Sequence, residues 1–192
     1  MKLFVVRHGQ SKANLGMRYT GQFDTPLTEL GVEQTKALQP ILAPYTFDKV
    51  YSSDLSRAAD TCANALPGAE AELTPLLREY DVGSLVGKLW NEVGDFQPAD
   101  PAMRPDYRAF GGENVDMVCD RVREFLHMLE ETDYEYVAAF SHFGFMKCML
   151  RVILGTAYDH RAVIAENCAI YVFEYDGSRW SIAALNYMKP II

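Results

Sequence analysis

The chain of 192 residues lacks long hydrophobic runs and any block of like charges. No apolar stretch approaches the about 20 residues that a membrane-spanning helix needs, so we expect no transmembrane segment and no membrane partner. The first apolar run is short and passes directly into charge, which is unlike a secretory signal peptide. We therefore expect a soluble, cytoplasmic protein.

Basic residues are also fewer than acidic residues. Lysine and arginine total 18 against 26 aspartates and glutamates, which gives a net charge of -8. An acidic surface argues against nucleic acid or an anionic membrane as the main partner, although a local basic pocket remains compatible with it. Hydrophobic residues make up 49% of the chain. That content can bury one good-sized core, so we expect residues 1–192 to form a single domain.

Cysteines are few, widely spaced and set in apolar stretches, and no CxxC pair occurs. They are Cys62, Cys119, Cys148 and Cys168. This spacing supports neither a zinc site nor a disulfide framework, and it predicts reduced, buried side chains. The sequence also lacks a Walker phosphate-binding loop and a cluster of carboxylates that would hold magnesium. We expect no metal and no cofactor.

Near the start of the chain, the apolar run Leu3–Val6 predicts a short buried strand that passes without a spacer into Arg7, His8 and Gly9. Open α/β sheets bind their ligands at the carboxyl ends of strands. An isolated Arg-His pair is more often structural, with the hydrogen bonds of the histidine made inside the protein and the arginine on the surface. Here it is one of several polar groups that follow predicted strands.

Along the rest of the chain, predicted strands alternate with predicted helices. Further strands are expected at 49–52, 73–79, 136–140, 169–174 and 180–185, with helices at 29–42, 55–65, 115–129 and 143–154. Thr28 is expected to cap the first of these helices, Ser53 or Asp54 the second, and Asp176-Gly177 to form a hairpin turn. An irregular loop is expected over 11–26. This pattern predicts an α/β fold, a three-layer α/β/α arrangement with a mostly parallel central sheet.

The strand ends of such a sheet gather two histidines, two arginines and a carboxylate on one side: Arg7, His8, Arg57, Glu79 and His142. Phosphoryl transfer needs cations around the phosphoryl oxygens, an in-line nucleophile and a proton for the leaving oxygen. A neutral imidazole can attack phosphorus at physiological pH, and a protonated carboxyl can serve the leaving group.

Arg57 has two possible partners. It lies in the first turn of its predicted helix, where a cation is disfavoured unless an anion is near. Asp54 could be that anion, which would make the arginine structural, or a bound phosphate could be. The sequence leaves both alternatives open.

Several motifs in order along the chain resemble the histidine phosphatase superfamily, the relatives of cofactor-dependent phosphoglycerate mutase. They are Arg7-His8-Gly9, Asn14, Thr20-Gly21, Pro26–Gly31, Ser52–Ala58, Leu77-Arg78-Glu79, Gly112-Glu113 and Ser141-His142. The resemblance covers residues 3 to about 145 and implies the phosphoglycerate mutase-like fold.

The resemblance also implies roles for individual residues. His8 would be the nucleophile that forms a phosphohistidine, and Glu79 would donate a proton and then activate water. The phosphoryl group would be held by Arg7, Arg57 and His142. Asn14 would contact the phosphate, and Thr20 and Gly21 would lie near the substrate. His127 and His160 match no motif, and we expect them to be surface or partly buried residues without a role.

Two departures from the family pattern bear on the substrate. Many relatives have two glycines after the second histidine, whereas this chain has Phe143-Gly144, so a bulky ring is expected to narrow or reshape the pocket. The interval from Glu79 to His142 is 142 minus 79, or 63 residues, which lacks the long insertion of the mutases. A shorter segment over the pocket admits water to the phosphohistidine and therefore favours hydrolysis over mutase chemistry.

We therefore expect a metal-independent phosphatase that acts on a small phosphorylated metabolite. The segment 82–110, which has no sustained periodicity, is expected to flank the pocket and carry specificity, and the alternative is a surface excursion without function. The alternatives are a phosphoglycerate mutase-type phosphoryl transfer and a non-catalytic phospholigand-binding protein. The oligomeric state stays open and includes a homodimer, since the apolar C-terminal hairpin and Ile191-Ile192 could form an interface or cover the sheet edge.

Overall fold

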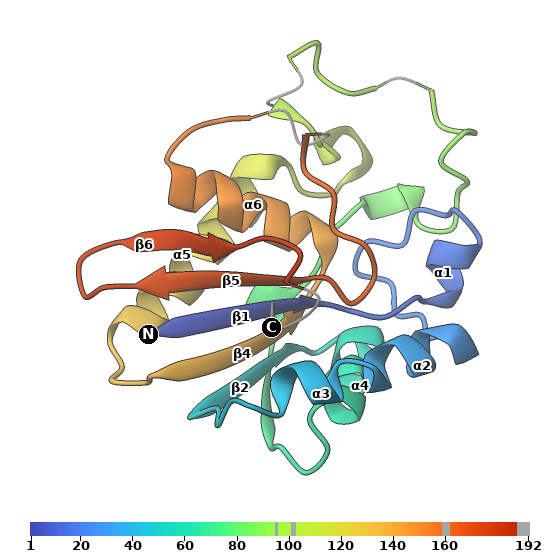
Figure 1. The fold of residues 1–192 in the computed structure, drawn as a ribbon. Coiled ribbons are helices and arrows are strands. Elements are labelled where there is room, and N and C mark those ends of the chain that lie inside the picture. Colours follow the sequence, from blue (N-terminus) through green and yellow to red (C-terminus); the bar gives the residue numbers. More distant parts are fainter. Residues whose placement is uncertain (95, 101–102, 159–161, 188–192) are drawn as a thin grey trace.

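The computed structural model describes residues 1–94, 96–100, 103–158 and 162–187, and it contains a mixed six-stranded sheet in the order β3-β2-β4-β1-β5-β6 (Figure 1). The strands are β1 Lys2–Arg7, β2 Lys49–Ser53, β3 Ala71–Thr74, β4 Tyr136–Ser141, β5 Ile170–Tyr175 and β6 Trp180–Ala184. The first four in this order pair in parallel, and β5 and β6 add an antiparallel hairpin. The expected mostly parallel sheet is confirmed.

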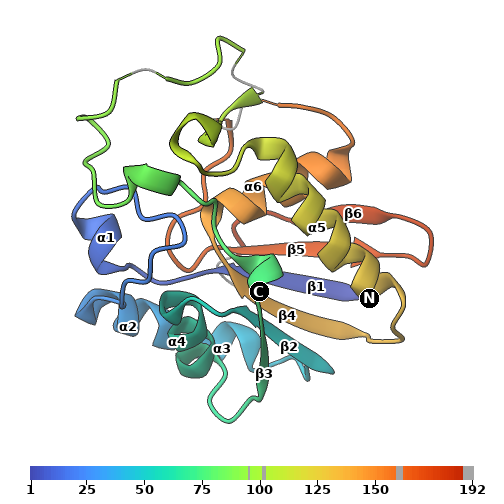
Figure 2. The ribbon, with the colours of Figure 1, turned by 180° about the vertical axis from the view of Figure 1, so that it is seen from behind.

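Helices cover both faces of the sheet, which gives the expected three layers. On one face lie α5 (Val115–Glu130) and α6 (Phe143–Leu154), and on the other α2 (Glu29–Lys36), α3 (Gln39–Leu42) and α4 (Ser56–Ala65) (Figures 1 and 2). Each face has its own apolar core. Leu3 and Val5 of β1 point to the α5–α6 side, and Phe4 and Val6 to the other. Alternate residues of a strand face opposite sides, so the continuous apolar run is buried by both layers.

Several sequence-predicted boundaries are confirmed. The hydroxyl of Thr28 accepts the N–H of Gly31 at the start of α2, and Asn114 caps α5 in the same manner through Met117. Gly155 ends α6 with a φ of +65°, a conformation that glycine adopts without a steric penalty. The turn between β5 and β6 contains Asp176-Gly177 as expected. All four cysteines are free and buried.

Two predictions about the N-terminal third are wrong. The expected loop over 11–26 contains a short helix, α1 (Lys12–Leu15), because Ser11 and Asn14 form a reciprocal cap across its first turn. The expected single helix over 29–42 is two helices, with the break at Ala37-Leu38. Pro40 lies in the first turn of α3, and because proline has no N–H it cannot continue the hydrogen bonds of α2.

The strand expected over 73–79 is also wrong at its carboxyl end. Pro75 cannot donate to a sheet ladder, so β3 ends at Thr74 and a 3-10 turn, η1 (Pro75–Leu77), follows. Glu79 therefore lies beyond a turn and does not end the strand.

The start of α4 differs from the prediction as well. Its N-cap is Leu55, which provides no side-chain hydrogen bond, so neither Ser53 nor Asp54 caps it. Ser53 instead accepts the N–H of Leu55 at 3.3 Å. Asp54 forms a two-pronged ion pair with Arg78, at 2.7 and 2.5 Å.

Between β3 and α5, the described part of residues 82–110 is largely irregular, with the short turns η2 (Gly83–Leu85) and η4 (Arg108–Phe110). Within the described ranges, no helix is long and apolar enough to cross a membrane. His160 and Ile191-Ile192 lie outside the described residues.

Candidate active site

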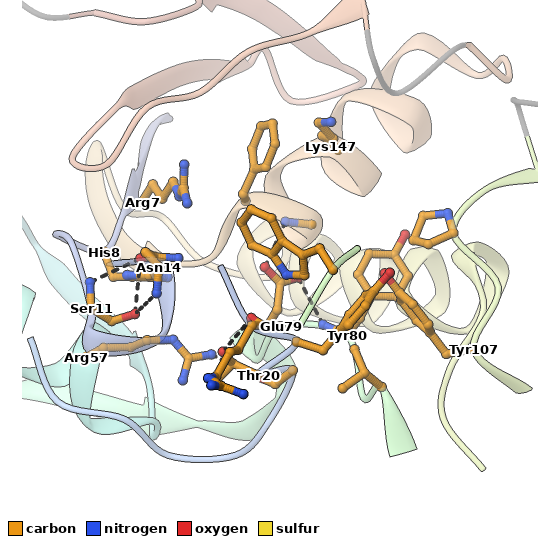
Figure 3. Close-up of a pocket in the computed structure, with 18 residues that line it drawn as sticks. Arg7, His8, Ser11, Asn14, Thr20, Arg57, Glu79, Tyr80, Tyr107 and Lys147 are labelled. Atoms are coloured by element: carbon orange, nitrogen blue, oxygen red, sulfur yellow. Dashed lines mark hydrogen bonds between the residues drawn. The ribbon is translucent and has the colours of Figure 1, made fainter. Parts of the chain in front are cut away.

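A hollow of about 420 Å³ lies at the carboxyl ends of β1 and β4 (Figure 3). Of the site residues predicted from the sequence, seven line it: Arg7, His8, Asn14, Thr20, Gly21, Arg57 and Glu79. The eighth, His142, lies behind the lining and is fully buried, with its ring centroid 5.1 Å from that of His8. In Figure 3, Tyr80 and Tyr107 lie on the side of the hollow opposite Arg7 and His8. The eight residues thus gather around one place.

The buried ring of His8 is held in one tautomer by its own loop. Nδ1 lies 2.7 Å from the carbonyl oxygen of Gly9, and because a carbonyl only accepts, Nδ1 carries the proton. Nε2 therefore keeps its lone pair. Burial, together with the charges of Arg57 and Arg7, holds the pKa of His8 well below its usual value of 6.5. The imidazole is neutral at physiological pH and presents a basic nitrogen.

The ring of His142 is held in the opposite tautomer. Its Nε2 lies 2.9 Å from the hydroxyl oxygen of Ser53, which already accepts the N–H of Leu55. Among the described residues, Nε2 is the one acceptor in reach of the proton of the buried Ser53 hydroxyl, so the hydroxyl donates to Nε2 and the proton of His142 lies on Nδ1. Burial and the charge of Arg57 lower the pKa of His142 well below 6.5. Nδ1 is buried, and its N–H has no hydrogen-bond partner among the described residues.

Two arginines bring positive charge to the same place. Arg57 is only 2% exposed and donates to the carbonyls of Gly21 (2.7 Å) and Phe23 (3.1 Å). Since Asp54 is engaged by Arg78, it is not the counter-ion of Arg57, and the structural alternative for this arginine loses its partner. Arg7 donates from one terminal nitrogen to the carbonyl of Ala165 at 2.5 Å, and its buried Nε has no partner within the described part of the chain.

The carboxylate of Glu79 is fixed by two backbone N–H groups. Tyr80 donates to Oε1 at 2.9 Å, and Gly144, in the first turn of α6, donates to Oε2 at 3.1 Å. A side chain at position 144 is impossible without rearrangement, because a Cβ there would lie 2.1 Å from Oε1 of Glu79. The glycine is thus what lets α6 approach the carboxylate.

An ion pair behind the site holds the backbone around Glu79. Arg121 of α5 binds Glu113 at 3.0 Å and also donates to the carbonyls of Leu76, Arg78 and Glu79. Glu113 in turn accepts the N–H of Asp81 at 2.8 Å. The Gly112-Glu113 motif therefore supports the site from behind and does not line it.

The remaining predicted site residues lie on the loops after β1. The side-chain oxygen of Asn14 accepts from the N–H and hydroxyl of Ser11 and from Asn167, which turns its amide nitrogen the other way. Gly21 has a φ of +51° and packs so closely on the backbone of Tyr80 that a Cβ would lie 2.7 Å from its carbonyl oxygen. Thr20 donates to the carbonyl of Arg18 at 3.3 Å.

Sequence reasoning missed the supporting residues. The sequence predicts Ser53 as a helix cap and as part of the Ser52–Ala58 motif, and it does not mark Arg121 as part of the site. Lys147 and Tyr107, which line the hollow, were not singled out. None of these has a local pattern that separates it from a surface or core residue, because each acts through contacts distant in sequence. Within the described ranges, no cluster of three or more His, Cys, Asp or Glu side chains could hold a metal ion.

Comparison with known proteins decides the family. The family model of the histidine phosphatase superfamily (branch 1) matches residues 3–188. The chain belongs to this superfamily. The family and fold expected from the motifs are thereby confirmed.

Named relatives in this superfamily include both phosphatases and mutases. The chain is 35% identical to a glucosyl-3-phosphoglycerate phosphatase of Mycolicibacterium vanbaalenii, over 85% of this chain and 78% of that protein. It is 28% identical to a probable phosphoglycerate mutase GpmB of Proteus mirabilis, over 94% and 87%. The solved structure of a mycobacterial glucosyl-3-phosphoglycerate phosphatase superposes with a TM-score of 0.84 at 26% identity, covering 96% of this chain and 98% of that one.

Proposed function

We propose that the protein is a metal-independent phosphatase that hydrolyses a small phosphomonoester through a phosphohistidine at His8. One observation carries the proposal. The basic Nε2 of His8 belongs to a site in which two buried donors, Nε of Arg7 and Nδ1 of His142, have no hydrogen-bond partner among the described residues. Unpaired buried donors cost free energy, and three phosphoryl oxygens would satisfy them.

In the first step, Nε2 of His8 attacks phosphorus, and the bond between phosphorus and the ester oxygen breaks. Arg7, Arg57 and the N–H of His142 stabilise the negative charge that spreads over the three equatorial oxygens. Glu79, as the acid, gives its proton to the departing oxygen, so an alcohol leaves. Both oxygens of Glu79 already accept one backbone N–H, which holds the carboxyl group in place for this transfer.

In the second step, water attacks phosphorus and the bond to Nε2 breaks. Glu79, now a carboxylate, takes a proton from the water, which regenerates the acid and releases inorganic phosphate. His8 returns to its neutral form with the proton still on Nδ1, because the carbonyl of Gly9 continues to accept it. Asn14 would contact the phosphate through its amide nitrogen, and Thr20 and Gly21 would border the substrate.

We further propose that residues 1–192 act as one domain in which the segment 82–110 selects the leaving group. Val82, Trp90, Pro105 and Tyr107 of this segment line the hollow next to the phosphoryl site. The size of the hollow, about 420 Å³, suits a small phosphorylated metabolite.

Phosphate release with a chelator present tests the proposal. Wild-type protein and the His8→Ala variant are incubated with a panel of phosphomonoesters, and free phosphate is measured. Release by the wild type alone supports the proposal, whereas equal release by both proteins contradicts it. Isomerisation of 3-phosphoglycerate without free phosphate would instead favour the mutase activity that the name of the Proteus mirabilis relative suggests.

A further inference from the structure

The side chain of Phe143 borders two hollows at once. It is the first residue of α6 and follows His142 directly. On one side lies the active-site hollow of about 420 Å³, and on the other a second hollow of about 560 Å³. Arg7 and Lys147 also border both. These three side chains therefore make up the partition between the two spaces.

The ring of Phe143 is held by a cation on each of two neighbouring elements. Nζ of Lys147, one helical turn further along α6, lies 4.0 Å from the ring centroid, and the guanidinium carbon of Arg7 lies 5.1 Å from it. Both distances fall within the range of cation–π attraction. Arg7 is itself anchored to the carbonyl of Ala165, so the ring rests against a fixed group. Arg7, Phe143 and Lys147 thus form a wall between the two hollows, and the two cation–π contacts hold the ring in place.

The second hollow has a mixed lining. The polar residues Gln34, Glu166 and Asn167 border it together with the apolar residues Val163, Ile164 and Ala165. The active-site hollow is lined instead by aromatic residues beside its polar end, among them Tyr19, Trp90 and Tyr107. Without the ring at position 143, a leaving group could extend from the first lining onto the second.

We propose that Phe143 is a specificity-determining residue that restricts this protein to phosphomonoesters with a compact leaving group, such as a single sugar or smaller. The inference rests on the proposed phosphatase function. The ring separates the two hollows, and a longer leaving group would need the space of both. Removing the ring leaves the bond of Arg7 to Ala165 and the bond of His142 to Ser53 in place, so we expect the phosphoryl site to persist in Phe143→Ala.

Glucose 6-phosphate and trehalose 6-phosphate form a matched substrate pair, since they share the phosphorylated glucose and differ by one further sugar. We expect wild-type kcat/KM to favour glucose 6-phosphate by about tenfold or more. In Phe143→Ala, kcat/KM for trehalose 6-phosphate should rise about tenfold, while that for glucose 6-phosphate changes less than about threefold. Phe143→Tyr, which keeps the aromatic ring and its contacts with both cations, should retain the wild-type ratio.

Two more variants test the wall. Met117→Ala truncates an exposed side chain of α5 that borders neither hollow, so it should leave the preference for glucose 6-phosphate in place. Lys147→Met removes one brace without cutting into the core and should raise activity on trehalose 6-phosphate about threefold. An unchanged ratio in both Phe143→Ala and Lys147→Met would overturn the inference.

The result with wild-type protein distinguishes failure of the role of Phe143 from failure of the proposed phosphatase function. Equal hydrolysis of the two sugar phosphates overturns the role of Phe143 and leaves the proposed function standing. No release of phosphate from either sugar phosphate or from p-nitrophenyl phosphate overturns both.

Discussion

The hydroxyl of Ser53 lies 2.9 Å from Nε2 of His142, and the same hydroxyl accepts the N–H of Leu55. Among the described residues, Nε2 of His142 is the one acceptor for the proton of this buried hydroxyl, so the serine donates to the histidine and the proton of His142 lies on Nδ1. Ser53 is fully buried at the end of β2 and does not line the hollow. It acts on the site through His142 and is a positioning residue.

Replacing Ser53 with alanine should remove the hydrogen bond to Nε2 that keeps the proton of His142 on Nδ1. We expect kcat to fall about tenfold, because His142 would no longer present an N–H to the phosphoryl group in every molecule. Nitrogen NMR of the His142 ring should show Nδ1 protonated in the wild type and a mixture of tautomers in Ser53→Ala.

The adjacent Ser52 provides a matched control. It is equally buried, but its hydroxyl donates to the carbonyl of Ser53 at 2.9 Å. Ser52→Ala should lose about 1 kcal/mol of stability, as Ser53→Ala does, and should keep the wild-type kcat and the His142 spectrum. Equal loss of kcat in the two variants would mean that Ser53 is only structural.

Gly144→Ala should lower activity while preserving the fold. The added Cβ would lie 2.1 Å from Oε1 of Glu79 and 2.5 Å from the ring of Tyr80, so the carboxylate must move. We expect kcat to fall about tenfold or more, although alanine is the better helix former. Gly94→Ala, where a Cβ meets nothing within 4 Å, should behave as wild type in the same assay. Wild-type kcat in Gly144→Ala would show that the position of Glu79 does not matter.

Arg121→Met should destabilise the protein and shift Glu79. The substitution leaves Glu113 without its ion pair and the carbonyls of Leu76 and Arg78 without their donor, whereas the carbonyl of Glu79 keeps the side chain of Gln22. We expect a loss of about 2–3 kcal/mol in the free energy of unfolding, less than for a fully buried pair because both side chains keep some exposure. Urea unfolding measures this loss. Arg123→Met removes an exposed pair with Asp120 on the same helix and should change stability by less than about 1 kcal/mol.

Stability should fall as the pH drops below 6.5. The pKa values of His8 and His142 are lowered in the folded state, so below pH 6.5 the unfolded chain binds more protons than the folded one. Each histidine then contributes a slope that approaches about 1.4 kcal/mol per pH unit, or about 2.8 for both, with the folded state losing stability as pH falls. Urea unfolding between about pH 7.5 and 5.5 measures the slope. His8→Gln and His142→Gln should each remove about half of it, and an unchanged slope in both variants would contradict this assignment.

How far the sequence predicts the fold depends on how local the signal is. The buried strands β1 and β4 are continuous apolar runs, and α5 has a helical period, so the positions of all three are predicted to within a residue or two. Two of the errors fall at Pro40 and Pro75, where one missing N–H ends an element that the apolar pattern alone would continue.

The residues of the candidate site also differ in whether a local sequence pattern predicts their position. Arg7, His8 and His142 follow directly from strand ends, so sheet topology brings them together. Glu79 reaches the same hollow by a different route, through a 3-10 turn and the Arg121 ion pair, which no short-range pattern reveals. The braced position of Phe143 likewise depends on Lys147 and Arg7 at once, and so it becomes visible only in three dimensions.

The most direct test of the account is to find the phosphoryl group on the enzyme. Wild-type protein is mixed rapidly with a phosphomonoester that it hydrolyses, quenched in alkali to preserve phosphohistidine, digested and mapped by mass spectrometry. The account predicts one added phosphoryl group on His8 in the wild type and none in His8→Gln. A phosphoryl group on another residue, or turnover by His8→Gln at the wild-type rate, would contradict it.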